Sequence, residues 1–278
     1  MSSTTSSPLP LRPLQFTLLS DVATWHGNDP DVSLFFNVLS TFFPEGETFF
    51  IKSVQDYRDV IEDPVLGEQV RRFCGQEGSH RREHTKYNAR LAEAGYPVPR
   101  LERQLKTRLT LLRRCLPARH RLAVTCALEH FTAVLADALL SDPRTLAGAA
   151  PDFAAIWTWH ALEEIEHKAV CFDVYQAMGG HWPERTFYMV LTTLGFLAGI
   201  VYHMHVFQKV EGRSWRMKPW QRTLRWLLHR PGADHRSLRL YLNYFRPDFH
   251  PWEGDGPKDL AAFYRAHPKL TVPTANGA

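Results

Sequence analysis

Carboxylates and histidines with the spacing of metal ligands are spread along this chain. Two Glu-x-x-His pairs occur, Glu77 with His80 and Glu164 with His167, and His160 comes one helical turn before the second pair. Spacings of three and four residues put side chains on one face of a helix, where they can converge on one point. One Glu from each of two helices plus a Glu-x-x-His pair from each of two others is how a four-helix bundle holds two metal ions. The sequence therefore predicts a dinuclear metal centre with the ligands Glu47, Glu77, His80, Glu129, His160, Glu164 and His167.

The charge and the donor atoms of this ligand set indicate which ions it would hold. Four carboxylates cancel the charge of two divalent ions, so the centre could be buried without a large net charge. Mixed oxygen and imidazole donors suit iron or manganese, and the absence of cysteine from the set argues against a structural zinc or iron–sulfur site. We expect two metal ions, in the first place iron, with manganese or a mixed Fe/Mn pair as the alternative.

Each of these residues also has a purely structural interpretation. Glu77 is surrounded by arginines and could be a surface charge, but it shares a helical stripe with His80 and His84 that the arginines largely avoid. Glu129 could pair with an arginine. Its small neighbours and its apolar surroundings make a metal ion the more economical partner for a charged group. We expect His84 to contact the centre without being a ligand.

At two places in the sequence, the ligand had to be chosen from two glutamates that lie close together. Glu164 has the three-residue spacing to His167, whereas Glu163 lies about 100° around the helix. We therefore assign Glu164 as the ligand and Glu163 as a partner that orients an imidazole. Glu47 is preferred to Glu45 because a Phe-Phe-Ile run follows it closely and suggests that it enters the core.

Composition sets wide limits on the class of protein. The 278 residues are 44% hydrophobic, which is ample for a core, and the net charge of +4 is modest, so nucleic acid is not an expected partner. The four cysteines are widely spaced without a Cys-x-x-Cys motif, so we expect buried, reduced thiols. The N-terminus has no basic region followed by an apolar core, so a signal peptide is not indicated and a cytoplasmic protein is expected.

Proline, aspartate and glycine signals divide the chain into helices, and no stretch has sustained strand alternation. We predict an all-α fold, a ferritin-like four-helix bundle with additional C-terminal helices. The expected parts are an irregular N-terminal segment (1–30), the di-metal bundle (31–180), C-terminal helices that pack on the bundle or face a membrane (181–267), and a tail (268–278). The expected helices cover about 31–60 with an interruption at Pro44, then 64–93, 98–115, 117–140 and 151–178.

The region after residue 180 has an open interpretation. Residues 187–208 contain no Asp, Glu, Lys or Arg and are long enough to span a bilayer, but Thr, His and Gly residues dilute the stretch, which favours a packed core helix. Residues 213–240 interleave Arg with Trp, a pattern that suits either a helix covering the bundle or an amphipathic helix on a membrane surface. The first interpretation is favoured. Membrane association through residues 187–240 and a homodimer stay open as alternatives.

Two family resemblances rest on these residues. The order Glu, Glu-x-x-His, Glu, His-x-x-x-Glu-x-x-His is similar to that of p-aminobenzoate N-oxygenases, ferritin-like di-iron proteins whose seven ligands include a third histidine. The phrases FPEGETFF, QEGSHRREHTKYN and WHALEEIEHKAVCFDVY resemble, over roughly residues 30–260, a bacterial family described as predicted metal-dependent hydrolases. The similarity to the N-oxygenases is confined to the ligands, so their arylamine substrate is not implied.

Three functions from different classes follow. The favoured one is a di-iron or di-metal oxygenase or oxidase that acts on an apolar small molecule and needs an electron donor. The alternative is a metal-dependent hydrolase, in which two metal ions activate a water molecule and polarise a carbonyl or phosphoryl group. The third is a helical protein that binds metal without catalysis. Dependence on O2 separates the first two.

Overall fold

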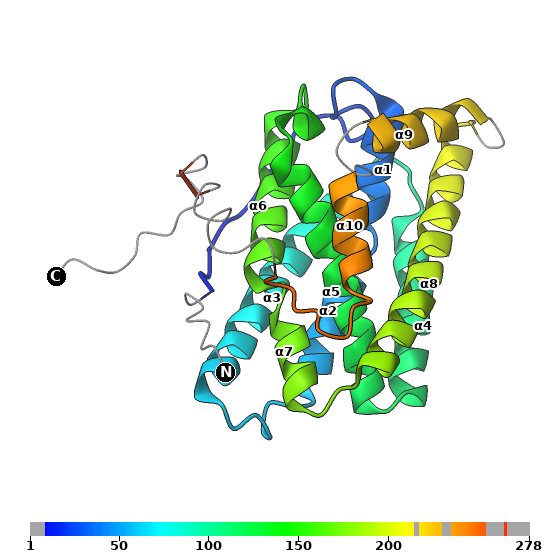
Figure 1. Ribbon diagram of the computed structural model, residues 1–278. Coiled ribbons are helices and arrows are strands. Elements are labelled where there is room, and N and C mark those ends of the chain that lie inside the picture. The colour runs from blue at the N-terminus through cyan, green and yellow to red at the C-terminus, as the bar shows by residue number, and fades with distance from the viewer. Residues whose placement is uncertain (1–8, 214–216, 230–234, 254–263, 266–278) are drawn as a thin grey trace.

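The computed structural model describes residues 9–213, 217–229, 235–253 and 264–265. Within these ranges every regular element is a helix, and the one β-type contact is an isolated bridge between His26 and Ala149. The prediction of an all-α fold is thus confirmed (Figure 1). The elements are α1 (Pro30–Ser40), α2 (Phe43–Gln55), α3 (Pro64–Glu93), α4 (Val98–Cys115), α5 (Ala118–Ser141), the short 3-10 helix η1 (Pro143–Leu146), α6 (Pro151–His167), α7 (Val170–Ala177), α8 (Trp182–Val210), α9 (Met217–His229) and α10 (His235–Asn243).

Local capping chemistry explains why several helices begin where they do. The Asp29 side chain accepts hydrogen bonds from the first free backbone N–H groups of α1, and Asp63 does the same for α3. Proline follows each of these aspartates, at a position where its missing N–H costs nothing. The interruption expected near Pro44 is the junction between α1 and α2.

The long helix expected over residues 151–178 is divided in two. α6 ends at His167, a turn occupies Lys168 and Ala169, and α7 begins at Val170. The expectation of one continuous helix was wrong. No proline or glycine lies between Pro151 and Gly179, so the sequence carries no local signal for this break.

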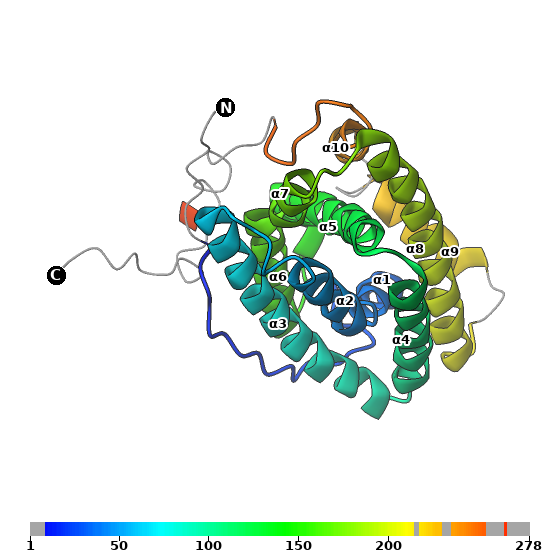
Figure 2. The ribbon, with the colours of Figure 1, turned by 90° about the horizontal axis from the view of Figure 1, so that it is seen from below.

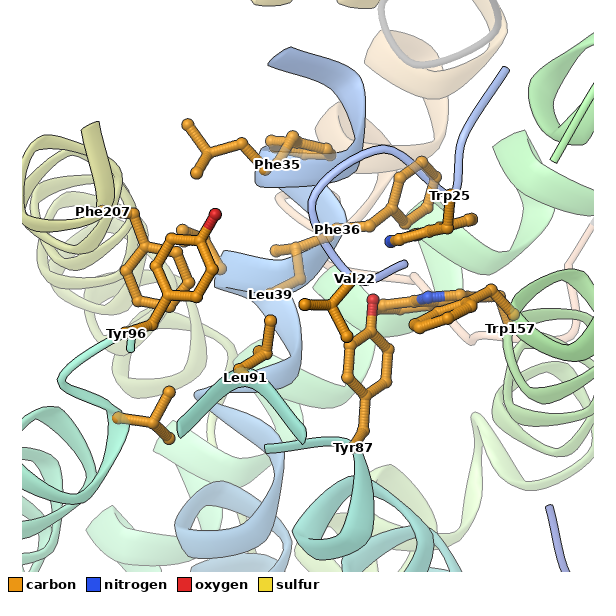
Figure 3. Close-up of a cluster of buried hydrophobic side chains, with 14 of the residues drawn as sticks. Val22, Trp25, Phe35, Phe36, Leu39, Tyr87, Leu91, Tyr96, Trp157 and Phe207 are labelled. Atoms are coloured by element: carbon orange, nitrogen blue, oxygen red, sulfur yellow. The ribbon is translucent and has the colours of Figure 1, made fainter. Parts of the chain in front are cut away.

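Helices α2, α3, α5 and α6 lie next to one another, with α2 packed along α3 and α6 packed along α5. Figure 2, which looks along these helices, shows α4 and α8 outside them and α2 in the interior. An aromatic cluster fills one end of this arrangement around α1, where Trp25, Phe36 and Trp157 meet Tyr87 (Figure 3). The amide of Asn37 ties this cluster together, because its oxygen accepts from Trp25 Nε1 and from the Tyr87 hydroxyl.

The segment before α1 has no helix, yet it belongs to the packed interior. Its Leu18, Val22 and Trp25 are buried in the aromatic cluster, and the guanidinium of Arg12 is buried against α6. Irregular structure is therefore combined here with the burial of several side chains, while others, such as Leu19, are exposed. The segment is held by side-chain contacts and by bonds such as Asn37 Nδ2 to the Val22 carbonyl, at 2.7 Å.

Helix α8 packs through one face only. Its inner face lies on α1 and α5, and Gly199 allows close approach, because a Cβ there would meet the Phe42 ring at 3.0 Å. Among the helices of the described residues, two, α5 and α8, are long and apolar enough to cross a membrane. The most apolar window of α5 is 67% buried inside the protein, whereas that of α8 is only 22% buried. The core helix that the sequence favoured for residues 187–208 is thus an outer helix with an exposed side.

Candidate metal centre

Four helices deliver the seven predicted ligands to one buried place. α2 carries Glu47, α3 carries the first Glu-x-x-His pair, α5 carries Glu129, and α6 carries His160 and the second pair. Each of the seven residues is at most 4% exposed. The convergence of these residues inside the helical bundle agrees with the geometry expected from the sequence. Glu45, the rejected neighbour of Glu47, is partly exposed and lies 3.8 Å from Lys106.

The seven residues form three overlapping groups of three, two of which share no residue. Glu77, Glu129 and His167 form one group, in which ligand atoms lie within 4.8 Å of one another. A second group of the same kind comprises Glu47, His80 and His160, and a third combines Glu77, His80 and Glu164. Two groups with separate oxygen and nitrogen donors are what two metal ions require.

Glu77 and Glu164 lie between the two groups. Glu77 Oε1 is 3.3 Å from His80 Nδ1 and 3.3 Å from His167 Nε2. Glu164 Oε1 is 3.1 Å from His160 Nε2, and its Oε2 is 3.6 Å from His167 Nε2. Each of these carboxylates therefore reaches histidines of both groups, so it could contribute to the binding of either ion.

The donor atoms facing the centre have no hydrogen-bond partner among the described residues. This holds for both carboxylate oxygens of Glu47, Glu77 and Glu129, for Glu164 Oε2, and for His80 Nδ1, His160 Nε2 and His167 Nε2. A buried polar group without a partner costs about 1–3 kcal/mol, and more when it is charged. So many adjacent unpaired oxygen and nitrogen donors are explained if metal ions are their partners, and the residues present fit a pair of ions.

The pKa values of the carboxylates point in the same direction. Burial, and next the charge of Glu77, raise the pKa values of Glu47 and Glu129 well above the ordinary value. Burial is also the main cause of the raised pKa of Glu77. At Glu164 burial opposes ionisation, but the imidazoles of His167, His160 and His80 outweigh it and lower the pKa. At His80 and His167 burial opposes protonation, but the neighbouring glutamates outweigh it and raise the pKa. The metal-free cluster thus keeps protons whose place metal ions would take.

Each of the three histidines uses one ring nitrogen for a hydrogen bond within the protein and turns the other toward the centre. His80 Nε2 donates to the carboxylate of Glu163 at 3.1 Å, which leaves Nδ1 free. Glu163 is fixed in turn by Trp159 Nε1 at 2.9 Å and by the guanidinium of Arg12 at 3.0 Å. These contacts place Glu163 where a residue that orients the imidazole of His80 would lie.

A chain of hydrogen bonds sets the tautomer of His160. The Ser40 hydroxyl donates to Asn88 Oδ1 at 2.8 Å, so it accepts from His84 Nδ1 at 2.9 Å. Burial lowers the pKa of His84 well below the ordinary value, so its Nε2 is an acceptor. His160 Nδ1 therefore donates to His84 Nε2 at 2.8 Å, and its own Nε2 is free for a metal ion. His84 therefore contacts the candidate centre through its hydrogen bond to His160. Burial and the neighbouring His80 also lower the pKa of His160 to about 4, so it is neutral, as a ligand must be.

His167 is oriented by a residue to which the sequence analysis gave no role. Gln76 Nε2 donates to Glu166 Oε2 at 2.8 Å and to the Pro10 carbonyl at 3.0 Å, which fixes the orientation of the amide. Its Oε1 then accepts from His167 Nδ1 at 3.0 Å. The only feature of the sequence that could have indicated a role for Gln76 is that it directly precedes Glu77 and shares its helical stripe. No feature of the sequence indicated a role for Arg12, which lies on the irregular segment.

An apolar cavity adjoins one side of the centre. His160 and Glu164 are its polar lining at that end. The remaining walls come mainly from aromatic and aliphatic side chains of α1, α2, α5, α6 and α9, among them Phe36, Leu39, Phe43, Leu139, Trp157 and Trp226. The small residues near Glu129, such as Thr132 and Ala136, border the cavity and leave room for it.

Comparison with known proteins gives one match. A family model described as "Predicted metal-dependent hydrolase" matches residues 10–255, which include all seven residues of the centre and also Arg12. The comparisons with curated proteins and with solved structures found no match.

Proposed function

The chain belongs to the family of predicted metal-dependent hydrolases, and we propose that it is an enzyme that uses two metal ions to hydrolyse a small, mainly apolar molecule. The observation that carries the metal part of this proposal is the cluster of buried oxygen and nitrogen atoms without hydrogen-bond partners among the described residues. The hydrolytic part rests on the family and on the chemistry that such a ligand set permits.

The two groups of ligands divide the ions between them. Glu77, Glu129 and His167 would hold one ion, Glu47, His80 and His160 the other, and Glu164 would reach both. The mixture of carboxylate and imidazole donors suits iron or manganese. Two such ions supply a water molecule of lowered pKa and a positive site for a carbonyl or phosphoryl oxygen.

The protein's own residues position the substrate. The aromatic and aliphatic walls of the cavity bind an apolar group and exclude water, which strengthens electrostatic interactions at the centre. His160 and Glu164 line the cavity, so the reactive bond of the substrate would lie beside the ion that His160 holds. Glu163, Gln76 and His84 keep the imidazoles fixed while the substrate enters.

A second candidate is O2-dependent oxidation of an apolar molecule by a di-iron centre, with an external electron donor. The observation that favours it is the lining of the cavity. Apart from His160 and Glu164, the side chains of the lining that contain polar atoms are Thr132, Thr145, Trp157 and Trp226. The cavity therefore offers few groups that could bind a charged leaving group. An apolar molecule without a hydrolysable bond would fit such walls as well as an ester would.

Metal analysis followed by two matched assays separates these candidates. Plasma mass spectrometry of the purified protein should find two ions per chain, and fewer in Glu129→Ala. The manganese-loaded protein, kept under nitrogen, is then offered aryl and short-chain acyl esters and phosphate esters, while O2 uptake of the reduced iron-loaded protein is followed with an electrode. Ester or phosphate cleavage under nitrogen supports the hydrolase. O2 uptake without cleavage in any metal form would replace it with the oxidase.

A further inference from the structure

The outer face of α8 carries a continuous row of exposed apolar side chains. They are Phe187, Val190, Leu191, Leu194, Leu197 and Val201, each between 47% and 62% exposed. Their spacing of three and four residues puts them on one side of the helix, over a length of about 21 Å at 1.5 Å per residue. Single exposed leucines are ordinary on protein surfaces, but a contiguous apolar row marks an interaction site.

Helix α10 widens this row into a surface. The Tyr241 hydroxyl lies 2.9 Å from Thr193 Oγ1, so α10 runs beside α8, as both views of the ribbon show (Figures 1 and 2). Leu238 and Leu242 of α10 are 55% and 52% exposed. We refer to the exposed row of α8 together with these two leucines as the α8–α10 face.

The charges that border the α8–α10 face are predominantly positive. On one side lies α4, which contains six Arg and Lys residues and one Glu, and it is joined to α8 by the bond from the Tyr202 hydroxyl to Gln104 Oε1. Arg108 follows Gln104 one turn later and is exposed. On the other side Arg239 of α10 is exposed. The acidic residues at the two ends of α8, Glu184 and Glu211, are in ion pairs with Arg119 and Arg213.

Helix α9, at the C-terminal end of α8, has the same character. Lys218, Arg222 and Arg225 are exposed, and Leu224 is 55% exposed. Basic and apolar side chains that alternate in this way are typical of helices that lie in the interface of an anionic bilayer.

We propose that the α8–α10 face docks on the surface of an anionic lipid membrane, with α8 lying in the plane of the interface. The apolar row would enter the boundary between headgroups and acyl chains, and the basic residues beside it would meet lipid phosphates. Docking in this way is independent of the reaction that the metal centre catalyses.

An in-plane orientation is required by the inner face of α8. His203 of that face is buried and bonded to the Thr41 hydroxyl at 2.8 Å, and Arg185 donates to the carbonyl of Tyr244 at 2.6 Å. If α8 spanned the bilayer, these contacts would have to break, or the basic helix α4 would have to enter the bilayer.

A second copy of the chain is the less favourable occupant of the α8–α10 face. A twofold contact across this face would bring the basic residues at its borders close to those of the partner.

Vesicle flotation tests the proposal directly. Metal-loaded protein is mixed with phosphatidylcholine vesicles that contain or lack one third phosphatidylglycerol, and the floating fraction is measured. We expect binding to the anionic vesicles that weakens with salt. Leu194→Ser combined with Leu197→Ser should lower the partition coefficient at least about tenfold, since two leucines no longer leave water. Arg108→Gln should lower it about fivefold, the equivalent of about 1 kcal/mol per basic residue.

Matched controls lie on other parts of the surface. Val60 and Val65 are 57% and 59% exposed, so Val60→Ser combined with Val65→Ser makes a comparable apolar change away from α8, and Arg58→Gln removes a charge there. Both should bind vesicles like the wild type. Wild-type protein that stays unbound at low salt would overturn the proposal. A second result would also overturn it. In that case sedimentation would show a dimer of the wild type and a monomer of the double leucine variant, and the wild type would not bind vesicles.

Discussion

The seven candidate ligands are recognisable by type and spacing, but the second nitrogen of each histidine is what would prepare them for metal. His80, His160 and His167 each use one ring nitrogen for a hydrogen bond to the protein and turn the other toward the centre. Three different groups do this, the carboxylate of Glu163, the imidazole of His84 and the amide of a glutamine. Each fixes the orientation of its ring in the absence of a metal ion.

Neighbouring glutamates on α6 should differ sharply in their effect on metal binding. Glu164→Ala removes a carboxylate that lies between the two groups, so we expect the loss of at least one ion. Glu163→Ala leaves every ligand in place and should weaken metal affinity by about 10–100-fold. Isothermal titration with manganese measures both. A larger loss in Glu163→Ala than in Glu164→Ala would reverse the assigned roles.

The histidine chain leads to a separate test. His84→Phe removes the acceptor of His160 Nδ1 but keeps a ring among the aromatic neighbours of His84, which include Phe43 and Trp157. We expect metal affinity to fall by about 10–100-fold with little loss of the overall fold. His84→Gln, whose side chain can accept a hydrogen bond, should recover part of the affinity. Equal affinities in both variants would mean that His84 only fills space.

At the scale of elements, the sequence predicted most helices because their starts are chemically marked. Aspartate followed by proline identified the start of α3, and Pro44 identified the α1–α2 junction, since these residues act locally. The break after His167 has no such local signal and depends on packing. The irregular segment before α1 was recognised as irregular, but the contact of Arg12 with α6 spans 151 positions and is invisible to any short-range pattern.

Arg12 makes the irregular segment part of the metal centre's support. Its guanidinium lies between Glu163 and Glu166, and all three side chains are at most 3% exposed. Arg12→Ala would leave two buried carboxylates without this cation, so we expect the free energy of unfolding to fall by about 3–5 kcal/mol. Urea denaturation monitored by circular dichroism measures the change.

The matched comparison for Arg12 is an exposed pair. Arg58 and Asp59 are 73% and 85% exposed, and removing such an ion pair changes stability by about 0–1 kcal/mol. Arg58→Ala should therefore unfold close to the wild type. A similar small change in Arg12→Ala would show that water replaces its contacts and that the segment contributes little to the centre.

At the scale of the whole molecule, composition alone does not place a helix. The most apolar windows of α5 and α8 have the same mean hydropathy, 1.5, yet one lies largely inside the protein and the other largely outside. α5 lies between α6 and α8, whereas α8 has neighbours on one side only. Whether a long apolar helix is surrounded depends on the order in which the other helices pack, and a single sequence does not reveal that order.

We expect bound metal ions to stabilise the fold, and we expect this stabilisation to increase as the pH rises. The pKa values of Glu47, Glu77 and Glu129 are raised in the fold, chiefly by burial, so the metal-free folded state keeps protons that the unfolded chain loses above pH 4.5. Because the folded state then binds more protons, these three groups make the metal-free protein less stable as the pH increases through the raised pKa values. Metal ions take the place of those protons, so their stabilising effect grows over the same range.

Differential scanning fluorimetry of metal-free and manganese-loaded protein between pH 5 and pH 8 measures this effect. At a free ion concentration of 100 times the Kd, each ion stabilises the fold by about 2.7 kcal/mol. For a chain of this size that corresponds to an increase in Tm of about 2–4 °C for each kcal/mol. We expect the difference in Tm between the two forms to be small at pH 5 and to widen toward pH 8. Glu47→Gln, which cannot ionise, should flatten the pH dependence of the metal-free form. A difference in Tm that stays constant across this range would mean that the buried carboxylates are already ionised without metal.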